Sequence, residues 1–280
     1  MKIGSYEVSC IETGEFALDG GAMFGVVPKT LWSKKFPTDT RNRIDMRLRC
    51  LLLQGDGRNI LIDCGMGTKW DSKMADIYRL DHSRFNMEKA LAEKGLEKNA
   101  ITDVVLTHLH FDHAGGSTTT ESDGRLAPAF PKATYYIQKE NLDWANHPTE
   151  KDRASYLKEN WEPLRSAGVL KIVEGPREIL PGITVRLFFG HTQAIQLPLI
   201  DDGKNKIFFC GDVIPTSSHL PIPWVMAYDN FPLTTMKEKR EILQQAAREK
   251  WILIFEHCPH IGSACVAPSE KGFTPLSVSV

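Results

Sequence analysis

The chain has 280 residues, of which 42% are hydrophobic and 25% charged, and its formal net charge is -1. This length and hydrophobic content predict one layered α/β domain over residues 1–280, with a large core. The near-zero charge excludes a global field that would draw the chain to nucleic acid phosphates or to an anionic membrane surface.

The N-terminal segment has neither the basic nor the apolar region of a signal peptide, and no later stretch is apolar enough for a membrane helix. We therefore expect a cytoplasmic protein. Six cysteines are scattered along the chain without a C-x-x-C pair, a pattern typical of reduced, mostly buried thiols.

The first part of the chain is predicted to be rich in strands. Residues 3–11 alternate loosely, and residues 47–54 and 59–63 form a hairpin about a Gly-Asp-Gly turn. Residues 86–94 repeat apolar side chains at helical spacing, and an apolar strand, residues 103–106, follows. The local order is therefore strand, helix, strand.

The second part repeats this pattern. Strands are predicted at residues 133–138, 170–173, 183–189, 197–200, 207–210 and 251–255, and helices at residues 139–145 and 235–250. Residues 147–163 are charged and contain tryptophan, which indicates a helical or partly mobile segment of unassigned role. Because no linker or short repeat divides the chain, we interpret its halves as two sheets packed face to face with helices outside.

The strongest motif follows the predicted strand of residues 103–106, where the chain reads T-H-L-H-F-D-H-A-G-G. Four candidate ligands lie at this strand end, where a loop can turn them into a cleft: His108, His110, Asp112 and His113. Imidazole nitrogens and carboxylate oxygens suit divalent ions such as Zn²⁺, and so many together would be costly without a metal. The sequence therefore predicts a metal site here.

This run resembles the H-x-H-x-D-H signature of the metallo-β-lactamase superfamily and matches it without a gap. Further family motifs follow in order: Asp63-Cys64-Gly65 for D-x-G, Gly190-His191-Thr192 for G-H-T, Gly211-Asp212 for G-D, and His257 after a late strand. Each of these residues alone would be read as a turn or surface residue, but their joint appearance favours a metal site. The resemblance implies a four-layered αβ/βα sandwich.

The resemblance also implies a pair of divalent metal ions, zinc in the first place, with manganese, iron or cobalt as alternatives. By this resemblance His108, His110 and His191 would bind one ion, Asp112, His113 and His257 the other, and Asp212 would bridge the two. Three protein ligands per ion and a shared carboxylate leave a position open for a bridging water, as in catalytic sites. The bridging hydroxide would be the nucleophile.

Carboxylates receive further roles in this interpretation. Asp112 would orient the hydroxide or carry a proton to the leaving group, so Asp112 and Asp212 are the catalytic candidates. Asp63 would hold a ligand histidine from behind.

Two apolar stretches, residues 19–25 and 221–228, are expected to form a hydrophobic wall beside the metal ions. The residues expected to line this pocket are Met23, Phe24, Phe111, His219 and Trp224. Packing in the core is the alternative for each of them. Such a wall suits a small, largely apolar ester, lactone or organophosphate substrate.

Within the superfamily, the chain is most similar to the branch of N-acyl homoserine lactonases and methyl parathion hydrolase-like enzymes. It departs from that branch at Ile195, where the second histidine of G-H-T-P-G-H is lost, and near Pro215, where many lactonases carry a tyrosine. The lost histidine lies behind the ligands and the tyrosine binds substrate, so the metal ligands survive both changes.

Other activities of proteins with this fold are the alternatives to ester or lactone hydrolysis. Glyoxalase II-like thioester hydrolysis, β-lactam hydrolysis and mono-iron persulfide dioxygenase activity stay open as alternatives. A flavodiiron reductase is disfavoured because it would carry glutamate in place of His110, and an RNA-processing nuclease because the charge provides no basic surface. The expected partner is a small-molecule substrate, without nucleic acid or membrane, and apolar loops near the N-terminus leave a homodimer open.

Overall fold

The first half of the chain builds one mixed sheet in the computed structural model, which describes residues 1–270 and 272–280. In sheet order its strands are β1 (Lys2–Ile3), β2 (Tyr6–Asp19), β3 (Arg43–Gly55), β4 (Arg58–Ile62), β5 (Asp103–Val105), β8 (Thr134–Gln138) and β9 (Leu170–Val173). Strands β1 to β4 are antiparallel neighbours, whereas β4, β5, β8 and β9 run parallel. A separate two-stranded ribbon pairs β6 (Thr118–Thr120) with β7 (Leu126–Pro128).

The second half builds a sheet of its own, again in chain order. Its strands are β10 (Arg177–Leu180), β11 (Ile183–Phe188), β12 (Ile195–Asp201), β13 (Lys206–Phe209), β14 (Ile252–Ile254), β15 (Ser263–Ser269) and β16 (Gly272–Ser277). All neighbours are antiparallel except β13 and β14, which are parallel because a long helix crosses over between them.

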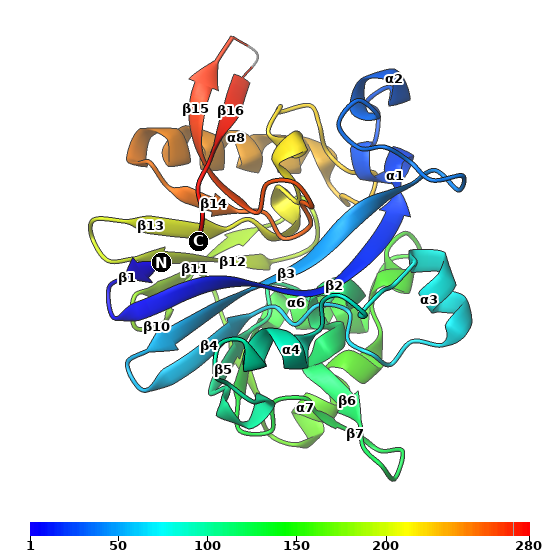
Figure 1. Ribbon diagram of the computed structural model, residues 1–280, viewed down its shortest axis with the longest axis vertical. Coiled ribbons are helices and arrows are strands. Elements are labelled where there is room, and N and C mark those ends of the chain that lie inside the picture. Colours follow the sequence, from blue (N-terminus) through cyan, green and yellow to red (C-terminus); the bar gives the residue numbers. More distant parts are fainter. Residues whose placement is uncertain (271) are drawn as a thin grey trace.

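Helices lie on the outer faces of the two sheets and at one end of the sandwich (Figure 1). They are α1 (Gly20–Phe24), α2 (Lys29–Trp32), α3 (Ser72–Tyr78), α4 (Met87–Ala92), α5 (Phe111–Ala114), α6 (Lys139–Asn146), α7 (Glu162–Ser166) and α8 (Pro232–Glu249). In Figure 1, α4 and α7 lie on the face of the first sheet that points away from the second sheet. Helix α8 lies on the opposite, outer face of the second sheet. The sandwich of two sheets with helices outside, predicted from the sequence, is confirmed.

Successive residues of the central strands point into different apolar layers. In β13, Ile207 and Phe209 belong to the core between the sheets, and Phe208 belongs to the core under α8. In β4, Ile62 faces the other sheet while Leu61 packs under the helices of the first half. Because these strands are buried on both faces, they read as continuous apolar runs in the sequence.

Some elements differ from the prediction. Strand β2 continues to Asp19, well past the predicted end at residue 11, because a register shift between Glu12 and Gly14 interrupts its alternation without ending its pairing with β3. The sequence does not predict helix α3, because it is only 7 residues long and none of its residues is buried. Residues 147–163 form short 3-10 turns rather than a regular helix before α7 begins.

Two further sequence-based expectations can be compared with the structure. All six cysteines are free, and four of them are buried. Among the residues that the structure describes, no helix combines the length and the apolar character needed to cross a bilayer.

Candidate metal centre

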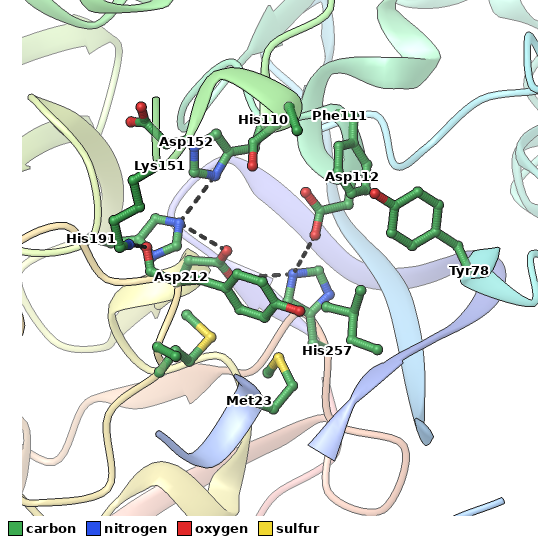
Figure 2. A pocket seen from close by; sticks show the side chains of 16 residues that line it. Met23, Tyr78, His110, Phe111, Asp112, Lys151, Asp152, His191, Asp212 and His257 are labelled. Carbon is green, nitrogen blue, oxygen red and sulfur yellow. Dashed lines mark hydrogen bonds and ion pairs between the residues drawn. The ribbon is translucent and has the colours of Figure 1, made fainter. Parts of the chain in front are cut away.

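The candidate ligands follow strands that end at one edge of the sandwich. His108 follows β5, His191 follows β11, Asp212 follows β13 and His257 follows β14. Strands β11, β13 and β14 run in one direction, since β12 is antiparallel to both of its neighbours and β13 is parallel to β14. Their carboxyl ends therefore meet, and side chains far apart in the sequence point toward one another (Figure 2).

A buried glutamine joins the two sheets just behind this edge. Gln196 in β12 donates from its backbone nitrogen to Thr107 O at 2.9 Å, and from Nε2 to Leu106 O and Tyr136 O at 2.8 and 3.0 Å. Its Oε1 accepts a hydrogen bond from Gln138 Nε2 at 3.0 Å. These bonds fix the strand ends of one sheet against those of the other, and so hold together ligands that come from different halves of the chain.

A first ligand group consists of three imidazoles and one carboxylate, from His108, His110, His191 and Asp212. His110 Nδ1 lies 3.0 Å from His108 Nε2 and 3.1 Å from His191 Nε2, although one Nδ1 has at most one proton to share. His191 Nε2 lies 3.1 Å from Asp212 Oδ2. Ligand atoms that bind one tetrahedral zinc at about 2.0–2.1 Å are roughly 3.3 Å apart, so this group has the spacing of a cation site.

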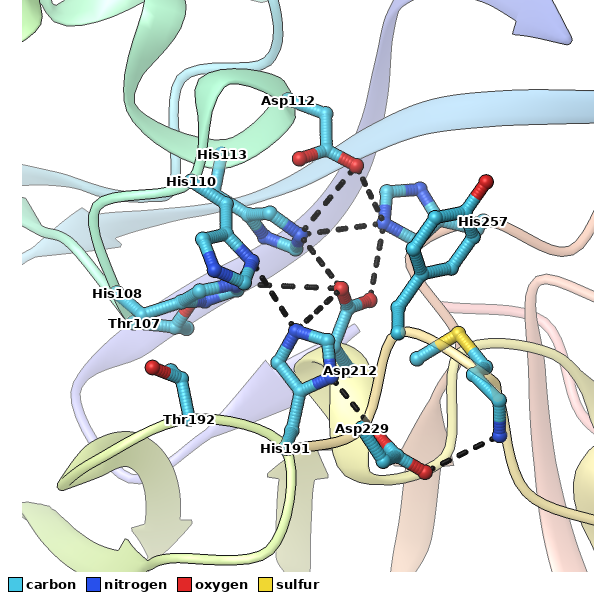
Figure 3. Close-up of polar contacts among 12 residues, drawn as sticks. Thr107, His108, His110, Asp112, His113, His191, Thr192, Asp212, Asp229 and His257 are labelled. Carbon is cyan, nitrogen blue, oxygen red and sulfur yellow. Dashed lines mark hydrogen bonds and ion pairs between the residues drawn. The ribbon is translucent and has the colours of Figure 1, made fainter. Parts of the chain in front are cut away.

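A second group contains Asp112, His113, His257 and again Asp212 (Figure 3). His257 Nε2 lies 3.2 Å from His113 Nε2 and 3.1 Å from Asp212 Oδ1. Asp112 Oδ2 lies 3.6 Å from His257 Nε2. Asp212 thus approaches both groups: its Oδ2 lies 3.1 Å from His191 Nε2 in the first and 3.3 Å from His113 Nε2 in the second, and its Oδ1 approaches His257 in the second.

The donor set fits a pair of divalent cations. All seven side chains are buried, and one ligand atom, Asp212 Oδ1, has no hydrogen-bond partner among the described residues, although it lies 3.1 Å from His257 Nε2. A buried polar atom without a partner costs about 1–3 kcal/mol. Nitrogen and oxygen ligands at tetrahedral spacing are those that zinc and its divalent neighbours accept, so cations would relieve this cost.

Burial and the shared carboxylate decide the charges in the cluster. Burial dominates at His108 and His110, whose pKa values lie well below the ordinary value. At His191 and His257 burial is the largest single effect and lowers the pKa, but Asp212, together with Asp229 at His191 and Glu256 at His257, outweighs it and raises the pKa of each to about 9. Burial would raise the pKa of Asp212, but the neighbouring histidines hold it well below its usual range. Asp212 is therefore ionised at neutral pH, as a carboxylate between two cations must be.

Three further carboxylates contact the ligand histidines from behind. Asp63 Oδ2 lies 3.0 Å from His113 Nδ1, and Glu256 Oε2 lies 3.0 Å from the same nitrogen. Asp229 Oδ1 lies 2.9 Å from His191 Nδ1. Asp63 and Asp229 form hydrogen bonds with their histidines, and such carboxylates fix the orientation of a ligand imidazole and increase its basicity. Burial raises the pKa of Glu256 to about 8.

Of these three carboxylates, the sequence predicts only Asp63 as a partner of a ligand histidine. The sequence does contain a signal for Glu256, because it is a charged residue that directly follows an apolar strand and stands next to His257. Asp229 had none, because it lies 38 residues after His191 and only the tertiary structure brings the two together.

Asp63→Asn is expected to weaken zinc binding by about 10- to 100-fold, because His113 loses the negative partner that favours its binding tautomer. The side chain also accepts hydrogen bonds from Thr107 N and Oγ1, both at 2.7 Å, and asparagine tolerates the positive φ of 57° at this position. Competition with a chromophoric chelator measures the affinity. Asp45→Asn, at an exposed site, is the control, and equal affinity of both variants would contradict the role.

A cavity of about 220 Å³ opens beside the ligands (Figure 2). Five ligand side chains, His110, Asp112, His191, Asp212 and His257, form one side of it. The rest of its lining comes from Leu18, Met23, Tyr78, Phe111, Lys151, Asp152, Ala154, Ser155, Met226, Ala227 and Tyr228. The predicted pocket residues Met23 and Phe111 therefore lie in the lining.

The structure corrects the expected lining at Phe24, His219 and Trp224, which lie outside it. The rings of Phe24 and His219 stack with centroids 4.7 Å apart, and the Trp224 ring meets Phe24 edge-on at 5.6 Å. His219 Nε2 is 2.8 Å from Met23 O, and its Nδ1 is 2.7 Å from Thr216 Oγ1. Both ring nitrogens of this buried histidine are thus satisfied by the protein, and the aromatic cluster supports Met23 instead of facing the cavity.

The segment of unassigned role, residues 147–163, forms one rim of the cavity. Its Lys151 lines the cavity, and Tyr156 forms a β-bridge with His110. The Tyr156 ring lies 4.6 Å from the His110 ring, and its hydroxyl is 2.5 Å from Thr192 Oγ1. The segment therefore supports a ligand histidine as well as the pocket.

Comparisons with known proteins agree with this geometry. A family model described as the metallo-beta-lactamase superfamily matches residues 49–257, a range that contains all seven candidate ligands. An N-acyl homoserine lactonase from Bacillus sp is 26% identical over 229 residues, which cover 76% of this chain and 82% of the relative.

Solved structures share the complete fold. A probable metal-dependent hydrolase from Staphylococcus aureus has a TM-score of 0.87 and 29% identity, over 100% of both chains. AidC, a dizinc quorum-quenching lactonase in complex with a product, has a TM-score of 0.80 and 22% identity, over 100% of this chain and 97% of its own. The likeness extends over both sheets and the edge where the ligands meet.

Proposed function

Since the chain belongs to the metallo-beta-lactamase superfamily and is a metal-dependent hydrolase, we propose that it binds two divalent cations, zinc in the first place, and hydrolyses small, largely apolar lactones or esters. One observation carries the proposal: seven buried ligands converge in two groups that share Asp212 beside a cavity. A pair of cations with open positions supplies, when bound, an activated water and a Lewis acid for the substrate oxygen.

The chain's own residues complete the chemistry. Asp112 lines the cavity as well as the second ligand group, so its carboxylate reaches both the nucleophile and the substrate. In lactone hydrolysis the water oxygen bonds to the carbonyl carbon, the ring C–O bond breaks, and the leaving oxygen takes up a proton. Asp112 orients the nucleophile and carries that proton. Asp212 and the five histidines would hold the cations.

The size and surface of the cavity support a small apolar substrate. Its volume of about 220 Å³ is below the roughly 300–1,000 Å³ of pockets for drug-sized ligands. Leu18, Met23, Phe111 and Met226 give it apolar lining beside the charged ligands. Such a pocket binds an acyl chain by burial of apolar surface and leaves the polar group for the metal side. An aryl ester or an organophosphate of similar size fits the same description.

A substrate panel on protein of measured metal content tests the proposal. We expect close to two zinc ions per chain and hydrolysis of an N-acyl homoserine lactone or an aryl ester with at least about tenfold higher kcat/KM than S-lactoylglutathione or nitrocefin, a difference of about 1.4 kcal/mol in transition-state binding. Paraoxon in the same panel tests organophosphate hydrolysis. One iron per chain with oxygen uptake on glutathione persulfide would overturn the proposal in favour of a dioxygenase.

A further inference from the structure

A tyrosine faces the cavity from the segment that precedes α8. Tyr228 lines the cavity together with Asp112, Asp212 and His257. The hydroxyls of the buried Tyr135 and Tyr156 both have hydrogen-bond partners. The hydroxyl of Tyr228 has none among residues 1–270 and 272–280, so it is available to a molecule in the cavity.

The hydroxyl of Tyr228 keeps its proton in this position. Tyr228 is 36% exposed at the mouth of the cavity, and its partial burial raises its pKa above the ordinary value, as do the neighbouring Tyr78, Asp19 and Asp112. The tyrosine lines the same cavity as Asp112, which is expected to orient the nucleophile. At neutral pH it is therefore a neutral hydrogen-bond donor close to the expected nucleophile.

The backbone is anchored on both sides of this tyrosine. Ala227 N donates to Ala22 O at 2.8 Å, which ties the segment to α1. Lys151 Nζ donates to the carbonyl oxygens of Tyr228 and Asp229 at 2.9 and 3.1 Å. A side chain whose backbone is fixed at neighbouring residues loses little freedom on binding a ligand, as a pre-organised contact requires.

Asp229 connects the tyrosine to the metal ligands. Its Oδ1 lies 2.9 Å from His191 Nδ1, and its Oδ2 accepts a hydrogen bond from Met226 N at 3.1 Å. The backbone of Asn230 donates to His191 O at 3.0 Å. Asp229 is 3% exposed, so its two carboxylate oxygens face these partners and not solvent. One buried carboxylate thus holds both a ligand histidine and the turn that carries Tyr228.

We propose that Tyr228 is a substrate-binding residue that donates a hydrogen bond to the substrate oxygen on which negative charge develops, and that Asp229 is the positioning residue that couples it to His191. The proposal rests on the proposed function and adds to it the polar contact that orients an ester or lactone carbonyl. No motif marks either residue. The proton stays on Tyr228 throughout, because the bond stabilises charge without transferring it.

Tyr228→Phe removes one oxygen and keeps the ring. We expect kcat to fall by about 10- to 100-fold, since a hydrogen bond to a charged oxygen is lost at the stage where it is strongest. KM is expected to change less than kcat, and the zinc content to stay at the wild-type value. Tyr6→Phe is the matched control, because the Tyr6 hydroxyl is buried far along the chain from the ligands and has no hydrogen-bond partner.

Asp229→Ala and Asp229→Asn test the positioning role with readouts other than turnover. The alanine variant is expected to lose about 10- to 100-fold in zinc affinity, because His191 loses its carboxylate partner. It is also expected to bind the hydrolysis product more weakly in calorimetry at saturating zinc, since the turn that carries Tyr228 is released. Asparagine keeps an acceptor for His191 and is expected to restore part of both losses.

The results separate this inference from the proposed function. If Tyr228→Phe turns over substrate at the wild-type rate, the role of Tyr228 is refuted and the hydrolase assignment stands. If Asp229→Ala binds zinc and product as the wild type does, the positioning role is refuted. If the wild-type protein with two zinc ions hydrolyses no member of the panel, the proposed function itself fails.

Discussion

Asp112→Asn is expected to reduce kcat by about 10²- to 10⁴-fold, the usual contribution of a positioned proton-transfer group. Asparagine has nearly the same shape as aspartate but can neither hold a negative charge nor carry a proton. The side chain is buried, lines the cavity, and places Oδ2 3.6 Å from His257 Nε2 and 3.8 Å from His113 Nε2. Steady-state kinetics measures the effect. Zinc is kept at a saturating concentration, so that a lower kcat reports lost proton transfer and not lost metal.

Asp143→Asn is the matched control for this experiment. Asp143 forms an exposed ion pair with Lys139 on α6, and such pairs contribute little to stability. Both variants are expected to fold, as circular dichroism and a melting curve would show. Unchanged turnover of Asp112→Asn beside a normal zinc content would refute the role assigned to Asp112.

Exhaustive chelation is expected to abolish hydrolysis and to destabilise the protein. Without cations, the ligand atoms of five buried imidazoles and two carboxylates lie against one another at 3.0–3.9 Å. Metal present at 100 to 1,000 times its dissociation constant stabilises a folded protein by about 2.7–4.1 kcal/mol. For a chain of this size the melting temperature should therefore fall by roughly 5 to 15 °C.

Calorimetry before and after chelation measures this change, and assays after the return of zinc measure recovery. Protein dialysed in parallel without chelator is the control. Full activity in the chelated protein, with metal analysis showing less than one-tenth of the original zinc, would refute a metal-dependent mechanism for this chain. Recovery with manganese or cobalt but not with zinc would change the identity of the ion and leave the ligand set intact.

The central strands and the first ligand run could be predicted from the sequence because their causes are local. Strands such as β13, buried on both faces, leave apolar runs whatever lies elsewhere in the chain. The four ligand candidates from His108 to His113 are neighbours in the sequence, so their density was visible at once. The sequence predicts His191, Asp212 and His257 as ligands because they stand at predicted strand ends, and because their motifs follow one another in the same order as in the metallo-β-lactamase superfamily.

The remaining features depend on contacts between distant segments. Asp229 and Tyr228 gain their importance from His191 and from the cavity, which lie in other parts of the chain. The sequence predicts Trp224, from the same stretch, as part of the pocket wall because its side chain is large and aromatic. In the structure its ring packs against Phe24 and the core cluster that contains it. Hydrophobicity alone does not tell a wall that faces a ligand from one that faces other side chains.

The division of the ligands between two sheets has a consequence for biosynthesis. The amino-terminal half brings His108 to His113, and the carboxyl-terminal half brings the bridging Asp212 and, near its end, His257. A nascent chain on the ribosome therefore has no complete cage until residue 257 has emerged and β14 has joined its sheet. Tight capture of the ions would be deferred until residue 257 has emerged, and a chain cut short before that point would be released as an unloaded, less stable product.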